Sequence, residues 1–181
     1  MLGHQTLLSL YYVSAFEILA ENVVPGQSSS PFVQQGYFLQ VTNLTNMDTP
    51  VSVRFPNACP PLENYDPSIS PAPATPLFAD VIDENGNANI ITTEFFQAPI
   101  GFGQILILAN TTRLFGIQLI SPTFSGTGSS RGLVTIEAPQ GALLSVAATI
   151  RQVFTTNTAN GVEYSASAYA LPLNNGPVLA F

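Results

Sequence analysis

The sequence contains no lysine and no tryptophan, and it has a single histidine, His4, and a single cysteine, Cys59. Four arginines stand against eleven acidic residues, which gives the 181-residue chain a formal net charge of −7. Binding to nucleic acid requires several cationic side chains along one surface, and four scattered arginines do not provide them. We therefore expect no nucleic-acid partner.

The same scarcity removes most catalytic chemistry. Without lysine the chain cannot form a Schiff base, and His4 alone would have to serve any Ser-His-Asp or Cys-His arrangement. A metal site with two histidines is impossible within one chain. Paired carboxylates for glycoside hydrolysis remain as an option, although the sequence does not place any two of the strand glutamates together: Glu94, Glu137 and Glu163. We expect a protein that is not an enzyme and needs no cofactor.

Charge is scarce as well, at 8% of residues, whereas hydrophobic residues make up 46%. This balance fits a β-rich extracellular or assembled protein better than a disordered chain. A single cysteine means no disulfide within the chain, so cysteine usage does not indicate the compartment. The most apolar stretch, residues 6–24, is interrupted by Glu17, Glu21 and Asn22, so we expect no membrane span. A virion or extracellular surface is favoured over the cytoplasm.

Alternation of apolar and polar residues with a period of two predicts half-buried β-strands along the chain. The pattern recurs in four segments: 37–42, 51–55, 144–151 and 162–169. The apolar run 105–109 does not alternate and predicts a central strand buried on both faces. Residues 5–21 favour a strand, although Ser14 to Glu17 has the spacing of a helix capping box.

Asn-Gly dipeptides at 85–86 and 160–161 lie between such runs and favour tight hairpin turns. We expect about nine or ten strands, joined mostly as hairpins. The predicted fold is all-β, a single antiparallel β-sandwich of the immunoglobulin-like or jelly-roll type spanning residues 1–181. In the last hairpin, Arg151 is expected opposite Glu163 as a cross-strand ion pair.

Residues 56–77 contain seven prolines, and proline cannot donate the backbone hydrogen bonds of a central strand. We expect a long loop that either lies across its own domain or docks on a partner, because pre-set φ angles lower the entropy lost on docking. The chain ends in the apolar segment 177–181, which requires cover from its own domain or from a neighbour. Candidate partner contacts are therefore Tyr65, Pro67 and Pro71 in the loop, and Leu179 and Phe181 in the tail.

The sharpest local pattern lies in residues 83–94. Counted from Asp83, oxygen-bearing side chains take the places of a calcium-binding loop at the third, fifth and twelfth positions: Asn85, Asn87 and Glu94. Ala88 stands at the sixth position, where such loops need glycine. A plain hairpin turn explains the same residues, so the calcium site and the turn are both kept as interpretations.

Low charge, a Pro-rich loop and an apolar tail together favour a non-enzymatic structural subunit. It would assemble into a homo-oligomer or a larger particle, such as a virion decoration or a surface filament. The alternative is a ligand-binding module for carbohydrate, with Tyr65 as an aromatic contact and calcium as a cofactor. Fold alone does not decide between these functions.

Overall fold

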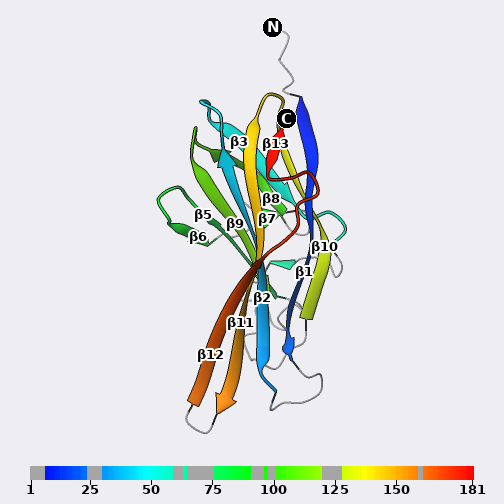
Figure 1. Cartoon of the computed structure of the whole chain (residues 1–181), viewed down its shortest axis with the longest axis vertical. Helices are drawn as coiled ribbons and strands as arrows, with labels where there is room; N and C mark the ends of the chain where they lie inside the picture. The colour runs from blue at the N-terminus through cyan, green and yellow to red at the C-terminus, as the bar shows by residue number, and fades with distance from the viewer. Residues whose placement is uncertain are drawn as a thin grey trace.

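A computed structural model describes residues 7–23, 30–58, 63–64, 76–90, 96–97, 101–119, 128–158 and 161–181. These residues form thirteen β-strands and, within the described ranges, no helix (Figure 1). Every strand pairing among them is antiparallel except that of β4 with β5. The prediction of an all-β, antiparallel fold is therefore confirmed.

Nine of the described strands have six or more residues: β1 (Leu8–Asn22), β2 (Phe32–Asn43), β3 (Thr49–Arg54), β5 (Pro76–Ile82), β8 (Gly101–Ile107), β9 (Thr112–Leu119), β10 (Gly128–Pro139), β11 (Leu143–Thr158) and β12 (Gly161–Ala170). Four are shorter: β4 (Glu63–Asn64), β6 (Ala88–Ile90), β7 (Phe96–Gln97) and β13 (Val178–Ala180).

The strands join into one sheet with the order β4-β5-β9-β2-β1-β10-β3-β8-β7. β11 also pairs with β2 and carries β12 and β13, whereas β6 pairs with β5. Figure 1 shows this sheet as strongly curled and open. Consecutive strands are neighbours in only a minority of cases, β1–β2, β5–β6, β7–β8 and β11–β12 among them. The expectation of mostly hairpin connections is wrong, because period-two patterning identifies a strand but not its neighbour.

The core lies on the concave side of the curl. A chain of aromatic rings runs through it from Phe16 to Tyr37, with centroids 5.8 Å apart, and from Tyr37 to Phe55, at 6.2 Å. It continues from Phe55 to Phe102 at 6.2 Å and to Phe115 at 5.3 Å. These rings come from separate parts of the sheet, so the curl brings distant strands onto one shared core.

Residues 8–22 form a strand, as favoured from the sequence, and the capping-box alternative at Ser14 is wrong. A register shift between Tyr12 and Ser14 in the pairing with β10 turns Ser14 inward. The Ser14 hydroxyl shares a 2.9 Å hydrogen bond with the buried Tyr37 hydroxyl. Burial raises the pKa of Tyr37, against the opposing effect of this hydrogen bond.

The prediction that residues 105–109 form a strand buried on both faces is wrong. The side chain of Leu106 is 49% exposed, whereas those of Ile105 and Ile107 are 7% and 0% exposed. β8 is thus half-buried like its neighbours, because the core covers only the concave face of the curled sheet. Because the outward-facing Leu106 is apolar, the sequence of this strand does not alternate between apolar and polar residues although its burial does.

Candidate functional site

Several residues predicted to bind partners or metal lie outside the described part of the chain: Tyr65, Pro67, Pro71 and Glu94. Within the Pro-rich segment, the described residues Glu63 and Asn64 form β4, which pairs in parallel with Pro76 and Leu77. The loop contacts therefore stay a prediction.

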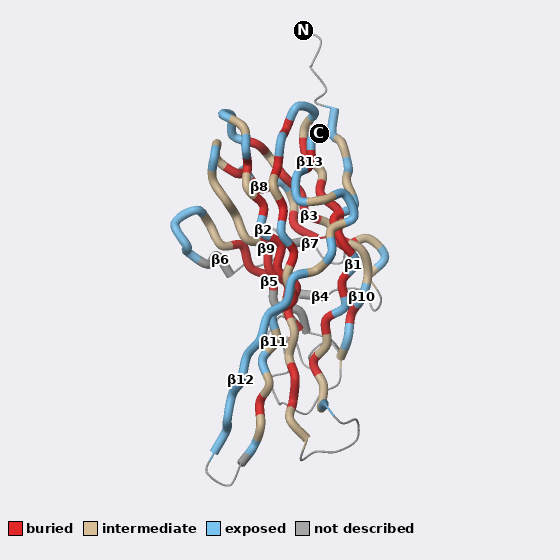
Figure 2. Tube along the Cα trace, viewed as in Figure 1, coloured by how far each residue is buried: buried red, intermediate tan, exposed pale blue. Residues whose placement is uncertain are grey.

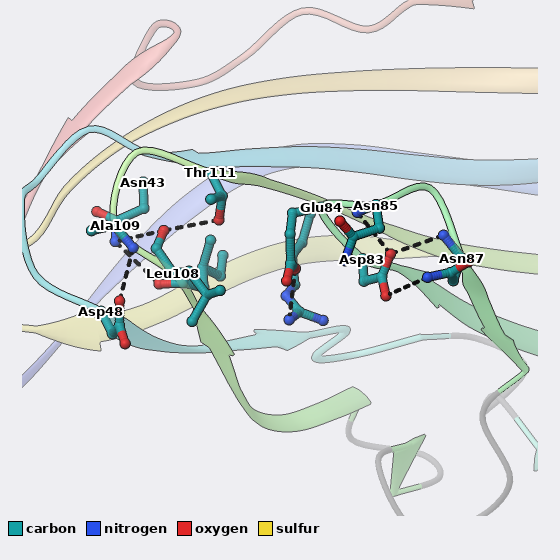
Figure 3. Close-up of polar contacts among 11 residues, drawn as sticks. Asn43, Asp48, Asp83, Glu84, Asn85, Asn87, Leu108, Ala109 and Thr111 are labelled. Atoms are coloured by element: carbon teal, nitrogen blue, oxygen red, sulfur yellow. Dashed lines mark hydrogen bonds and ion pairs between the residues drawn. The ribbon is translucent and has the colours of Figure 1, made fainter.

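The Asp83 carboxylate organises the turn between β5 and β6 (Figure 3). Its Oδ1 accepts hydrogen bonds from the backbone N–H groups of Asn85 and Asn87, at 2.9 and 2.8 Å. Its Oδ2 accepts a third from the Asn87 side-chain amide at 3.1 Å. These hydrogen bonds lower the pKa of the half-buried Asp83, and the bond from the Asn87 backbone has the largest effect. Gly86 has a φ of 82°, which a tight turn requires and glycine adopts without strain.

The predicted hairpin at Asn85-Gly86 is therefore confirmed. Both oxygens of Asp83 accept hydrogen bonds within the turn. Among the described residues, no group of three or more His, Cys, Asp or Glu side chains could hold a metal ion. Calcium binding with Glu94 as a ligand remains a prediction.

The apolar tail packs on its own chain. Leu179 lies in β13 opposite Leu144 and is 1% exposed. The Phe181 ring meets Tyr11 edge-on at 4.7 Å, and its backbone N–H donates to the Ala142 carbonyl at 2.8 Å. The cover that the tail requires thus comes from its own domain, and a partner-binding role for Leu179 and Phe181 has no support from these contacts.

The strand glutamates Glu137 and Glu163 lie on strands that do not pair with each other. Glu137 on β10 accepts a 2.9 Å hydrogen bond from Arg54 as part of an ion pair. Glu163 lies on β12, a strand whose described pairing is with β11 alone. The arrangement does not assemble these two carboxylates into a hydrolytic pair.

A groove that the sequence did not reveal is lined by residues of β2, β5, β9, β11 and β12. Phe38 on β2 stands opposite Gly116 on β9. A Cβ atom at Gly116 would lie 2.8 Å from the Phe38 ring. The guanidinium of Arg151 on β11 lies over the same ring, 4.3 Å from its centroid. The ring is thus held between a glycine backbone and a cation.

Asp80 on β5 lies on the far side of Gly116 and is 8% exposed. Its Oδ1 is buried and has no hydrogen-bond partner among the described residues. Burial raises the pKa of Asp80, against the attraction of Arg151 and of its own backbone N–H. A buried carboxylate oxygen without a partner is costly, and Asp80 is one of four described residues with such an unpartnered buried side-chain atom.

The groove around these residues has a volume of about 710 Å³. Its lining combines polar and charged side chains with bulky apolar ones: Gln34, Gln118, Asp80, Arg151, Gln152 and Ser167 on the one hand, and Phe38, Ile82, Leu119 and Val153 on the other. Amide and carboxylate groups can bind a ligand rich in hydroxyl groups. The sequence signal that could have indicated the groove is the pair Gly36 and Gly116, because glycine inside a strand marks a close approach.

β12 is the second unusual feature. All ten of its residues are exposed, on both faces of the strand (Figure 2). The prediction of a half-buried strand over 162–169 is therefore wrong. The pairing of β11 with β12 places Thr158 opposite Gly161, Thr156 opposite Glu163 and Arg151 opposite Ala168. The predicted turn at 160–161 lies partly outside the described residues. The predicted Arg151–Glu163 pair is wrong because the register of β11 and β12 differs from the one assumed.

The backbone of β12 presents an ordered edge. Next to the paired residues Thr149 and Ala170, the N–H of Leu171 donates to the carbonyl of Ala148 at 2.9 Å. Opposite residues in an antiparallel pair alternate between hydrogen-bonded and non-hydrogen-bonded positions. Odd-numbered residues of β12 therefore direct their backbone groups to β11, and even-numbered residues direct theirs away from it. The outward set is Val162, Tyr164, Ala166, Ala168 and Ala170.

The sequence matches no known protein family and no curated protein. In the part of the chain that the structure describes, there is no helix of the length and apolar character that a membrane span requires.

Proposed function

We propose that this protein is a non-enzymatic structural subunit that assembles with copies of itself, on a virion or an extracellular surface. The observation that carries the proposal is β12, a ten-residue strand exposed on both faces. Val162, Tyr164 and Tyr169 are 48%, 67% and 45% exposed. Exposed apolar and aromatic side chains in one strand are typical of a surface that another molecule covers.

The edge of β12 also lacks the features by which monomeric proteins prevent strand pairing. Such edges carry lysine, proline or a bulge, or they are very short. β12 has neither lysine nor proline, and Glu163 is its only charged residue. Its register with β11 runs without a shift from Gly161 to Ala170. An edge of this kind favours assembly by strand addition.

We further propose that the curled sheet is a β-sandwich of the immunoglobulin-like or jelly-roll type. Support comes from the aromatic chain that joins β1, β2, β8 and β9 in one core. Only residues 20–22 of β1 pair with β2, so this short bridge connects the two halves of the sheet. A crystal structure in which β1 and β2 separate would establish two sheets, and one in which they pair along their length would overturn the sandwich.

Sedimentation of the whole chain over a wide concentration range tests the assembly proposal. We expect reversible association, weakened by the substitution Val162→Lys, which places a lysine on the edge strand. Leu106→Lys is the matched control, because Leu106 is equally exposed on β8. A wild-type chain that stays monomeric at every concentration would overturn the proposal. If Leu106→Lys weakens association as much as Val162→Lys does, the association does not depend on β12.

A second candidate function, binding of a carbohydrate or another hydroxyl-rich ligand, is favoured by the groove at Asp80. The unpartnered carboxylate and the surrounding glutamines match the hydrogen bonds that such a ligand offers. Screening the wild-type chain and the Asp80→Asn variant against a set of glycans tests it. Binding that survives the substitution unchanged would place the ligand elsewhere.

A further inference from the structure

Resting on the proposed function, we infer the mode of assembly: β12 pairs antiparallel with β12 of a second copy, about a two-fold axis at Ala166. The occupant of the edge is thus an identical chain. The pairing would extend each sheet into the other, in the strand order β2-β11-β12 followed by β12-β11-β2 of the second copy.

The backbone selects this register. A two-fold axis perpendicular to the sheet places every residue opposite one on the same face, and the outward groups must meet outward groups. With Ala166 opposite its own copy, Tyr164 faces Ala168 and Val162 faces Ala170. All five outward residues of β12 are then paired. Moving the centre by one residue, to Ser165 or to Ser167, leaves part of the outward set without a partner within the strand.

The side chains agree with the same register. Glu163, the only charged residue of β12, falls opposite Tyr169 of the second copy, so no like charges face each other. Ser165 faces Ser167, and the bulky Tyr164 faces the small Ala168. A centre at Glu163 itself would place two carboxylates directly opposite, which is unfavourable.

Cysteine cross-linking tests the register. In a chain with Cys59→Ser, the variant Ala166→Cys places two sulfur-bearing residues opposite each other, with Cα atoms about 5.5 Å apart. Ser165→Cys places them about 8 Å apart, beyond disulfide reach. We expect disulfide-linked dimers from the first variant under mild oxidation and few from the second. The Cys59→Ser chain without added cysteine is the control.

Proline substitution tests the backbone. Because the Ala166 N–H points away from β11, Ala166→Pro removes hydrogen bonds between copies and none within the hairpin. Two bonds lost per dimer would raise the dissociation constant about thirtyfold or more. Ala166→Ser keeps the N–H and should leave the constant within about threefold of the wild type. Circular dichroism establishes that each variant is folded, and if Ala166→Pro is not, the cross-linking series decides alone.

The outcomes separate the two proposals. Cross-linking at position 166 together with the proline effect supports the two-fold β12 pairing. Association that persists without cross-linking at 166, or that the folded proline variant leaves unchanged, overturns this pairing and leaves the proposed function intact. A chain that is monomeric throughout overturns the proposed function and this inference with it.

Discussion

Gly116→Ala is the substitution whose effect can be worked out most fully from the outer groove. The added Cβ would lie 2.2 Å from the Asp80 Oδ1 atom and 2.8 and 3.0 Å from two atoms of the Phe38 ring. Both neighbours are buried, and Arg151 lies over the ring. The methyl group therefore meets two packed side chains, and either the strands separate slightly or the two side chains shift toward the groove that they line.

Overpacking of this kind costs about 1–3 kcal/mol. Against it, replacing a strand glycine by alanine gains roughly 0.5–1 kcal/mol through the unfolded chain and strand propensity. The net expectation is a loss of about 1–2 kcal/mol in the free energy of unfolding. For a chain of this length each kcal/mol lowers Tm by about 2–4 °C, so the fall should be about 2–8 °C.

Urea denaturation at low protein concentration measures this loss without a contribution from association. Repeating Gly116→Ala in an Asp80→Ala background removes the closest contact, so the cost there should be smaller by about 1 kcal/mol. A Gly116→Ala variant as stable as the wild type, or more stable, would refute the close packing of Phe38 and Asp80 over this glycine. If Gly116→Ala lowers the free energy of unfolding equally in the wild-type and the Asp80→Ala chains, the contact with Asp80 is not the cause of the loss.

Three further predictions concern the acidic groups and the tail. Asp80→Asn should raise the free energy of unfolding at neutral pH by about 1 kcal/mol. Because the folded-state pKa of Asp80 is raised, its ionisation destabilises the fold increasingly as pH rises above the unfolded value of 3.8, so the stability gained by Asp80→Asn should vanish well below that pH in urea denaturation. A gain in stability that grows toward low pH would contradict the raised pKa. Leu179→Ala should lower the free energy of unfolding by about 2–5 kcal/mol, whereas Leu106→Ala, at an exposed site, should lower it by under about 0.5 kcal/mol. Equal losses from the two substitutions in urea denaturation would show that the tail is not part of the core. The predicted calcium site at Asp83, Asn85, Asn87 and Glu94 implies that calcium raises Tm by several degrees, and an unchanged Tm would show that these residues form a hairpin turn and no metal site.

Period-two patterning was sufficient for the strands whose one face meets the core. Tyr37, Leu39 and Val41 are all fully buried, as the alternation indicates. The same pattern failed for β12, because alternation reports which residues share a face and not whether anything covers that face. At Leu106 the lack of alternation indicated burial on both faces, but the Leu106 side chain lies on the outer face and is exposed.

The groove could not be predicted for a different reason. Phe38, Asp80 and Arg151 lie on β2, β5 and β11, and they come together only through pairings between strands that are far apart in sequence. Sequence spacing carries no information on such pairings. The hairpin turn at Asp83 was predictable because all of its hydrogen bonds lie within five consecutive residues.

Amide hydrogen exchange along β12, resolved by residue and followed against protein concentration, tests the account most directly. We predict that the odd-numbered amides Glu163, Ser165 and Ser167 are protected at every concentration, because they bond to β11. The outward amides of Tyr164, Ala166 and Ala168 should exchange freely in dilute solution and become protected as the chain associates. Outward amides that still exchange freely when the chain is fully associated would contradict assembly through this edge.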